Sequence, residues 1–221
     1  MEGLISMEAF MHSLPFIAYG VGLSLQLLLG GLVIGLLLGT VFAILRYQGI
    51  ALGIITRFVS IIRGTPLILQ LSFVYFSIPM LLGFKLSILV AGIITFGLNS
   101  AAYVSEILRS GIESLPKGQF EAAKTLNIKG FPMWRDIILP QVLRNILPAM
   151  VNETITLLKE TALISTLGGM DMMRRAQAVA AEQFTYFVPL CIAGFYYYLL
   201  VLVIEYAGKK LEKKVAYAPH H

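Results

Sequence analysis

The chain alternates long apolar stretches with short polar segments, and the apolar stretches decide its fold class. Four of them contain no Asp, Glu, Lys or Arg and cover residues 9–45, 64–84, 86–105 and 183–204. Each is at least as long as the ~20 residues that an α-helix needs to cross the ~30 Å hydrocarbon layer of a bilayer. The pattern therefore predicts membrane-spanning helices.

A fifth stretch, residues 146–170, is equally apolar except for Glu153, Lys159 and Glu160. We count it as a span, so the prediction is an all-α membrane protein with five transmembrane helices in a single domain over residues 1–221. The first stretch is too long for one crossing. We therefore expect residues 9–20 to lie along the membrane interface before the true span.

Three glycines recur at every fourth position of the first span. Gly31, Gly35 and Gly39 fall on one face of a helix with this spacing. A glycine stripe lets a neighbouring helix approach closely. We interpret it as a packing feature.

Composition supports the membrane assignment. The chain is 57% hydrophobic and 13% charged, whereas a soluble domain carries roughly 25% charged residues. Its 221 residues leave no room for a second, soluble catalytic domain. The single cysteine, Cys191, excludes a disulfide framework and a cysteine-based metal site. We expect no metal site, and we interpret His220 and His221 as the remnant of an expression tag.

The basic residues predict the orientation. With the N-terminus outside, the inner segments hold Arg46, Arg57, Arg63, Arg109, Lys117, Lys124, Lys129, Arg135, Arg144, Lys209, Lys210, Lys213 and Lys214. The outer segments then hold only Lys85, Arg174 and Arg175. Cytoplasmic loops carry an excess of Lys and Arg, so the N-terminus is predicted outside and the C-terminus inside. Because these residues lie between apolar runs rather than in one patch, the net charge of +5 does not indicate nucleic-acid binding.

The longest inner loop, residues 114–140, predicts a short, sharply bounded helix. Pro116 suits its first turn, and residues 119–126 are good helix formers. Asn127 is placed to end it in a left-handed conformation. We expect Ala122 and Ala123 to present a small surface, with Phe120 as an anchor beside them, for docking into a groove on a partner protein.

Three motifs in the chain resemble one protein family. They are Glu121-Ala122-Ala123 followed by Ile137-x-Leu139-Pro140, Arg63-Gly64-Thr65-Pro66-Leu67 followed by Gln70 and Pro79, and Leu157-Leu158-Lys159-Glu160-Thr161-Ala162-Leu163. The first resembles the EAA loop of ABC importer permeases, and the others resemble the polar amino acid branch, of the histidine, glutamine and arginine type. The resemblance runs from about residue 22 to 211. The family usually has glycine where this chain has Asn127; asparagine is the best substitute at positive φ.

The resemblance implies the partners. The fold would be that of a type I ABC importer permease in a bacterial cytoplasmic (inner) membrane. The loop, through Phe120, Glu121, Ala122, Ala123 and Asn127, would form a coupling helix in a cleft of a nucleotide-binding ATPase subunit. A second permease copy and an extracytoplasmic solute-binding protein would complete the complex. The chain has no G-x-x-x-x-G-K-[ST] motif, so we expect no enzyme activity and no cofactor here; ATP and magnesium would bind the partner subunit.

Polar residues on the third and fourth spans predict a substrate site. Charged side chains at a helix centre are costly in lipid, so they should face protein or a watery cavity. At about 100° per residue, one arc of the fourth span holds Asn152, Glu153, Thr156, Lys159 and Glu160. A stripe on the third holds Thr95, Asn99, Tyr103, Glu106 and Ser110, with Ser100 at its edge. If these spans face each other, the two arcs enclose a polar site.

That site has the groups that an amino acid zwitterion needs. Asn99, Ser100 and Lys159 can donate to a carboxylate, and Glu153 or Glu160 can accept from an ammonium. Two acidic residues favour a cationic substrate such as arginine, lysine or histidine; pairing of Lys159 and Glu160 with subunit neighbours is the alternative. The resemblance also implies that Leu67 is a substrate-binding residue.

Three alternatives remain open. Residues 168–183 form an outer segment that either contacts a binding protein or lies on the membrane as an amphipathic cap. The Gly-Pro break after Arg63 either kinks a gating helix or marks a loop boundary. The whole chain is either an ABC permease subunit or a stand-alone oligomeric secondary transporter or channel, although such transporters normally carry an inverted repeat, which this sequence lacks.

Overall fold

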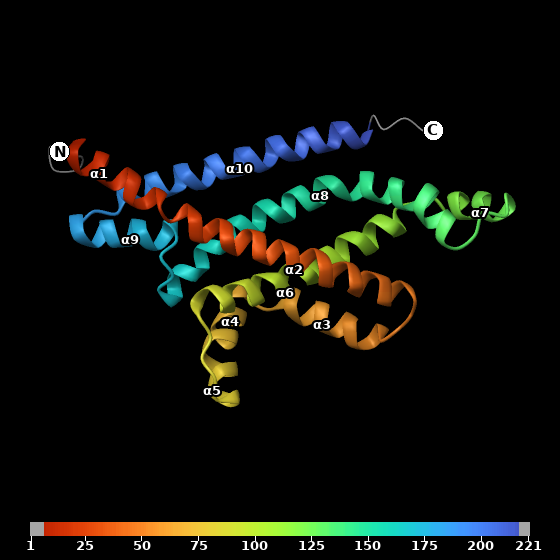
Figure 1. Cartoon of the computed structure of the whole chain (residues 1–221), viewed down its shortest axis with the longest axis horizontal. Helices are drawn as coiled ribbons and strands as arrows, with labels where there is room; N and C mark the ends of the chain where they lie inside the picture. Colours follow the sequence, from red (N-terminus) through yellow and green to blue (C-terminus); the bar gives the residue numbers. More distant parts are fainter. Residues whose placement is uncertain (1–6, 217–221) are drawn as a thin grey trace.

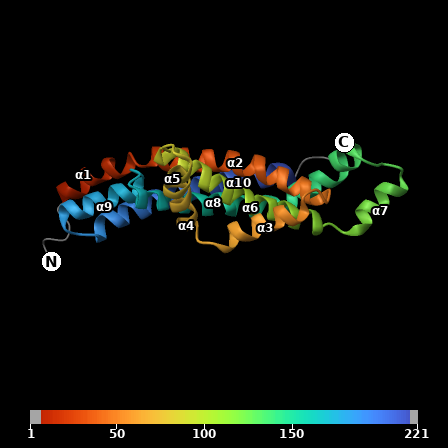
Figure 2. The ribbon, with the colours of Figure 1, turned by 90° about the horizontal axis from the view of Figure 1, so that it is seen from below.

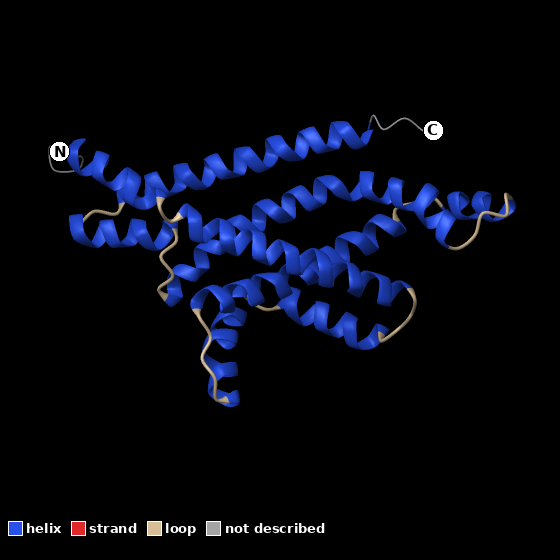
Figure 3. Cartoon of the chain, in the orientation of Figure 1, coloured by secondary structure: helices blue, strands red, loops and turns tan. Residues whose placement is uncertain are grey.

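The computed structural model describes residues 7–216, and within this range the chain is all helical (Figure 3). The predicted tag remnant lies outside the described residues. The α-helices are α1 (Met7–Ala18), α2 (Val21–Tyr47), α3 (Leu52–Gly64), α4 (Leu67–Ser72), α5 (Ile78–Leu82), α6 (Ile88–Glu113), α7 (Lys117–Thr125), α8 (Leu139–Glu160), α9 (Met172–Gln183) and α10 (Phe187–Ala216). Three shorter helical segments adjoin these helices. The π-helical segment η1 (Phe73–Ser77) follows α4, the π-helical segment η2 (Met133–Ile138) precedes α8, and the 3₁₀ helix η3 (Thr161–Leu167) follows α8.

The long helices run side by side along one axis (Figure 1). Helices α1 and α9 lie at one end, while α7 projects from the other, toward which α10 also runs (Figures 1 and 2). The α4–α5 segment stands out from the side of the bundle. The chain therefore has a small helical cap at one end and a projecting helical loop at the other.

Within residues 7–216, three helical stretches are long and apolar enough to cross a membrane: Phe10–Tyr47, Ile88–Glu113 and Phe187–Val215. A fourth candidate is the pair Leu52–Gly64 and Leu67–Leu82, which is bent by 106°. Helix α8 is less apolar than the three because charged and amide side chains are spread along its whole length. This count of three or four is lower than the five spans predicted from the sequence.

The first apolar stretch is divided as the sequence predicts, although its position relative to a membrane stays a prediction. Helix α1 ends at Ala18 and α2 begins at Val21. Gly20 lies between them against the backbone of the outer segment, where an added Cβ would be 2.3 Å from the Met172 nitrogen. Only glycine fits this contact.

The glycine stripe packs α2 against α6, as predicted. An added Cβ at Gly35 would lie 2.5 Å from the Ser100 Oγ, and one at Gly39 would lie 2.7 Å from the Val104 Cβ. Next to this contact is the largest buried cluster, which contains Leu27, Leu28, Leu67, Leu71, Phe96, Leu157, Leu158 and Ile164. The α2–α6 pair is thus the centre of the fold.

The bend between α3 and α4 has a local cause. Pro66 disfavours the helical conformation of the residue before it, and Thr65 is extended, with φ −117° and ψ 147°. The Gln70 amide then donates to the Ile62 and Thr65 carbonyl oxygens at 2.7 and 3.1 Å. These bonds satisfy carbonyls that the end of α3 leaves free. The chain therefore bends at the Gly-Pro break, and a gating role for this bend stays a prediction.

Candidate functional site

Helices α6 and α8 pack together, and their contact buries the centre of the predicted substrate site. Asn99 and Ser100 on α6 and Glu153 on α8 are all buried. The Ser100 hydroxyl lies near the Glu153 carboxylate but has no hydrogen bond of normal geometry among the described residues, and Glu160, seven residues along α8, adds a second negative charge on the same side of that helix. The structure thus buries one carboxylate and one hydroxyl at the α6–α8 interface, with a second carboxylate farther along α8.

Three residues of the α8 arc lie to one side of Glu153 and Glu160, on the exposed face of that helix. Asn152, Thr156 and Lys159 are exposed, while Glu160 is half-buried. The exposed residues follow one another at intervals of four and three, so they form one stripe along α8. One chain therefore does not enclose the predicted polar site: the acidic side chain of Glu153 is buried, whereas the basic side chain of Lys159 is exposed.

Leu67 and Tyr103 are separated from this acidic pair. Leu67 is buried at the start of α4, within the largest apolar cluster. Tyr103 lines a cavity of about 500 Å³ between α3, α6 and α8, and the Arg63 guanidinium carbon lies 5.3 Å from its ring centroid. The same cavity is lined by Glu106, Ser110 and Asn145. It continues the polar stripe of α6 toward α7, as the spacing predicted.

Glu106 is the centre of a charged cluster at that end of α6. Its carboxylate accepts from Arg46 of α2 at 3.0 Å, lies 4.0 Å from Arg63 of α3, and pairs with Arg109 one turn along α6. Arg109 also pairs with Glu113. The cluster joins three helices and carries one positive charge in excess.

Helix α7 ends as predicted at Asn127. This residue has φ +56°, and the Ile128 N–H donates to the Ala123 carbonyl at 2.9 Å. A left-handed residue followed by this bond is the Schellman motif that closes many helices. Asparagine tolerates the left-handed region better than other non-glycine residues, so the departure from the usual glycine leaves the helix stop intact.

The predicted docking surface of α7 needs a correction. Ala122 is exposed, but Ala123 is 2% exposed and packs inside the loop's own cluster with Leu115 and Met133. Phe120 also faces inward, with its ring 6.3 Å from that of Trp134. Ala123 presents no surface to a partner, because it fills the apolar core of the loop itself, whereas Phe120 is half-buried and its role as an anchor stays a prediction.

The exposed face of α7 is made by other residues. Glu121, Ala122 and Lys124 are exposed, and the large apolar side chains of Leu126 and Phe131 are 71% and 72% exposed. Trp134 ties the base of this loop to the bundle, since its ring also contacts Tyr47 of α2 at 4.9 Å. The sequence analysis missed Leu126, Phe131 and Trp134, although three large apolar residues in a polar loop were a visible signal.

The outer segment, residues 168–183, forms α9 and packs on α1 and α10. Asp171 is buried and caps α9, accepting from the Arg174 N–H at 2.8 Å and from the Tyr197 hydroxyl at 3.0 Å. Burial raises the pKa of Asp171, and these two hydrogen bonds oppose that effect. Arg175 lies over the Phe16 ring at 5.0 Å. Side-chain contacts thus hold this segment to α1 and α10.

Helix α3 was also not predicted, because Arg57 and Arg63 interrupt its apolar run and leave no long uncharged stretch. Ile55, Phe58, Val59 and Ile62 recur at helical spacing and pack against α2 and α6 through Phe42, Leu45 and Ala102. That spacing is the signal of an amphipathic helix, and the search for uncharged stretches passed over it. Within residues 7–216, no group of three or more His, Cys, Asp or Glu side chains is placed to hold a metal ion.

These features describe an all-helical membrane protein with a polar helix interface and a projecting helical loop, which is the class of a transport permease. Residues 31–217 match the family described as binding-protein-dependent transport system inner membrane component, and the chain belongs to this family. It is a membrane-embedded permease subunit, and in this family ATP hydrolysis lies in a separate subunit. These findings do not favour the alternative of a stand-alone secondary transporter.

Two relatives match the chain over nearly its whole length. The arginine transport system permease protein ArtQ of Bacillus subtilis is 43% identical over 213 residues, 96% of this chain and 97% of that protein. The putative glutamine transport system permease protein GlnP of Rickettsia typhi is 46% identical over 208 residues, 93% of this chain and 95% of that protein.

Solved structures show the same fold. A chain of the structure described as an amino acid ABC transporter with histidines aligns with a TM-score of 0.87 and 32% identity, covering 95% of this chain and 99% of that one. A chain of the MetNI methionine ABC transporter aligns with a TM-score of 0.73 at 19% identity, covering 96% of this chain and 99% of that one, which shows the fold alone.

Proposed function

We propose that this permease subunit carries a polar, cationic amino acid (arginine, lysine or histidine) and that Glu153 contacts its positive charge. The observation that carries the proposal is that α8 places two acidic residues, Glu153 and Glu160, beside an exposed polar stripe made by Asn152, Thr156 and Lys159. Two of the relatives above are an arginine and a glutamine permease by name. Both substrates are polar amino acids, and the second acidic charge favours the cationic one.

In the proposed topology, five segments cross the membrane: α2, the bent pair of α3 and the α4–α5 segment, α6, α8 with η3, and α10. An odd number of crossings agrees with the positions of α1 and of the end of α10 toward opposite ends of the bundle (Figure 1). The excess of Lys and Arg beside α7 then favours a cytoplasmic α7. The outer cap of α1 and α9 would face the solute-binding protein.

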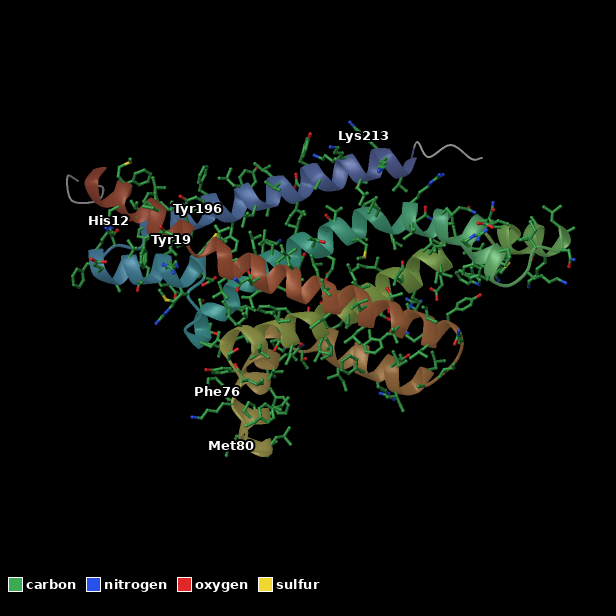
Figure 4. The ribbon with its side chains drawn as sticks, viewed as in Figure 1. His12, Tyr19, Phe76, Met80, Tyr196 and Lys213 are labelled. Atoms are coloured by element: carbon green, nitrogen blue, oxygen red, sulfur yellow. The ribbon has the colours of Figure 1, made fainter. Side chains whose placement is uncertain are left out.

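The proposed site would be completed by a second permease copy, identical or closely related. Asn152, Thr156 and Lys159 form an exposed polar stripe on α8, which lipid would penalise. The α4–α5 segment carries Phe76 and Met80 away from the bundle (Figure 4), with exposures of 59% and 86%. A partner permease covering this side would shield both features and close the polar path around Asn99, Ser100, Tyr103, Thr156 and Lys159.

Coupling to the ATPase subunit would run through the exposed face of α7. Glu121, Ala122 and Leu126 lie outermost there, and α7 projects beyond the other helices (Figure 2). Phe120, Ala123 and Asn127 would act in the same process by fixing the position of α7. ATP and magnesium would bind only the partner subunit.

The proposal is tested with Glu153→Gln in the complex reconstituted with its ATPase and binding-protein partners. A hydrogen bond to a charged group contributes about 1.5–3 kcal/mol, so we expect about tenfold or greater loss in arginine uptake and in arginine-dependent ATP hydrolysis. Glu205→Gln, the same change at a half-buried residue of α10 outside the proposed site, is the matched control for expression and assembly.

Subunit assembly should be unchanged in both variants, as measured by co-purification. Arginine uptake by Glu153→Gln at the unaltered rate would contradict the assignment of Glu153. Competition of arginine, glutamine and glutamate for the binding protein tests the substrate class independently of that residue.

A further inference from the structure

A second groove lies on the other side of α6 from the polar cavity. It has a volume of about 420 Å³ and almost entirely apolar walls, which include Ile44, Tyr47, Leu108, Ile112, Trp134 and Val142. At about 100° per residue, Ile112 lies about 200° around α6 from Ser110, which lines the polar cavity. The two hollows therefore open on different sides of the bundle.

The apolar groove continues a surface that faces lipid. Leu29, Val33, Leu37 and Ile44 form an exposed apolar stripe along α2, each between 50% and 65% exposed. Ile44 ends this stripe and begins the groove. Aromatic residues such as Tyr47 and Trp134 gather at the level of lipid headgroups. The groove thus lies where the hydrocarbon layer meets the α7 side of the membrane.

A charged cavity adjoins the groove. It has a volume of about 350 Å³, is lined by Arg46, Arg109 and Glu113, and shares Ala43, Tyr47 and Ile112 with the groove. Arg46 and Arg109 belong to the cluster around Glu106, which has one more positive than negative charge. The buried Nε of Arg46 has no hydrogen-bond partner among the described residues. An anion would complete this cluster.

We propose that these two adjoining hollows bind one anionic phospholipid. An acyl chain occupies the apolar groove against Trp134, and the phosphate lies at Arg46 and Arg109. A phospholipid has an apolar chain that fits the groove and an anionic headgroup that fits the charged cavity. The lipid-facing stripe of α2 gives its route of entry. Trp134 contacts Phe120 of α7. The bound lipid therefore adjoins the residues that hold α7 to the bundle.

Trp134 is the only tryptophan of the chain, which makes its fluorescence a direct reporter. The full chain is reconstituted in dioleoyl phosphatidylcholine vesicles that contain either brominated phosphatidylglycerol or brominated phosphatidylcholine, both of which quench tryptophan on contact. A basic residue near the surface favours an anionic lipid by about fivefold. We expect phosphatidylglycerol to quench Trp134 at about one-fifth of the concentration that phosphatidylcholine requires, and this preference should weaken in high salt.

Variants locate the site. Thr40→Phe places a ring at the groove wall and should reduce quenching by both lipids. Val33→Phe, two turns away on the same exposed face of α2, is the matched control and should not. Arg46→Gln should remove the preference for phosphatidylglycerol while quenching by phosphatidylcholine persists, and Arg46→Lys should restore it.

Three results would overturn the proposal. Equal quenching by the two lipids in the unaltered chain excludes a site for an anionic headgroup, and this measurement needs no variant. Unchanged quenching in Thr40→Phe excludes an acyl chain in the groove. Absence of quenching by either lipid shows that a second protein surface covers the groove.

Discussion

At the scale of single residues, Asn127 shows how a side chain sets the end of a helix. Its φ of +56° is a conformation that costs most L-residues about 1–2 kcal/mol. The strength of the stop therefore depends on the residue type at this one position, which has no large side chain to bury.

We expect Asn127→Gly to keep α7 intact and Asn127→Val to destabilise its end by about 1–2 kcal/mol, because a β-branched side chain is strained at positive φ. Hydrogen exchange of the Ile128 amide, which donates to Ala123, measures the effect. Exchange in the valine variant that is no faster than in the glycine variant would contradict this explanation.

The same loop shows what the sequence can and cannot predict. The stop at Asn127 is local, because it depends on one residue's backbone preference, and it was predicted correctly. The burial of Ala123 is not local, since it depends on Leu115 and Met133, which approach only after α6 and α8 have packed. In the candidate site, helical spacing placed Glu153 and Glu160 on one side of α8 but did not show which side α6 would cover.

At the scale of elements, the pairing of α2 with α6 depends on close backbone approach. Gly35→Ala should destabilise the protein by about 1–3 kcal/mol, the usual cost of overpacking, because the new Cβ would meet Ser100 Oγ at 2.5 Å. Gly22→Ala, where nothing lies within 4 Å of the new Cβ, is the control on the same helix. Thermal unfolding in detergent should show a lower midpoint for Gly35→Ala than for Gly22→Ala.

The orientation of α7 makes a prediction about its contacts. In a Cys191→Ser background, which removes the exposed native thiol, Ala122→Cys should crosslink to the ATPase subunit through a short bifunctional reagent. Ala123→Cys should crosslink at least tenfold less, because its side chain is buried. If both positions react equally in intact membranes, the exposed face of α7 has been assigned wrongly.

Elements were predicted unevenly from the sequence. The apolar runs of α2, α6 and α10 were found because an uncharged stretch longer than ~20 residues has few alternatives to a membrane helix. Helix α3 was missed because its Arg57 and Arg63 broke the run, although Ile55 and Val59 are buried. Amphipathic periodicity, rather than absence of charge, was the signal needed there.

At the scale of the whole molecule, one buried residue, Asp171, links three helices of the cap. Its carboxylate caps α9 and accepts from the Tyr197 hydroxyl of α10, and its backbone lies beside Gly20 before α2. Burial raises its pKa above the ordinary value of about 3.9. The folded state therefore binds this proton more tightly than the unfolded state does.

The contribution of Asp171 to stability is consequently greatest below its unfolded pKa and is lost as the pH rises through its higher folded pKa. We expect Asp171→Asn, which keeps a capping side chain, to flatten this part of the pH dependence. Thermal unfolding midpoints of both proteins between about pH 4 and 7 test it. A difference between the two that does not change with pH would contradict the assignment.

The Gln70 side chain has a consequence for how the whole molecule can move. Its amide holds the end of α3 to the start of α4 with bonds of 2.7 and 3.1 Å, and Arg63 joins α3 to the Glu106 cluster. Flexing the 106° bend between α3 and the α4–α5 segment would break the Gln70 bonds. We therefore expect α3 and the α4–α5 segment to move together as one rigid unit when the permease opens and closes. The displacement should then occur at the contacts between this unit and the neighbouring helices.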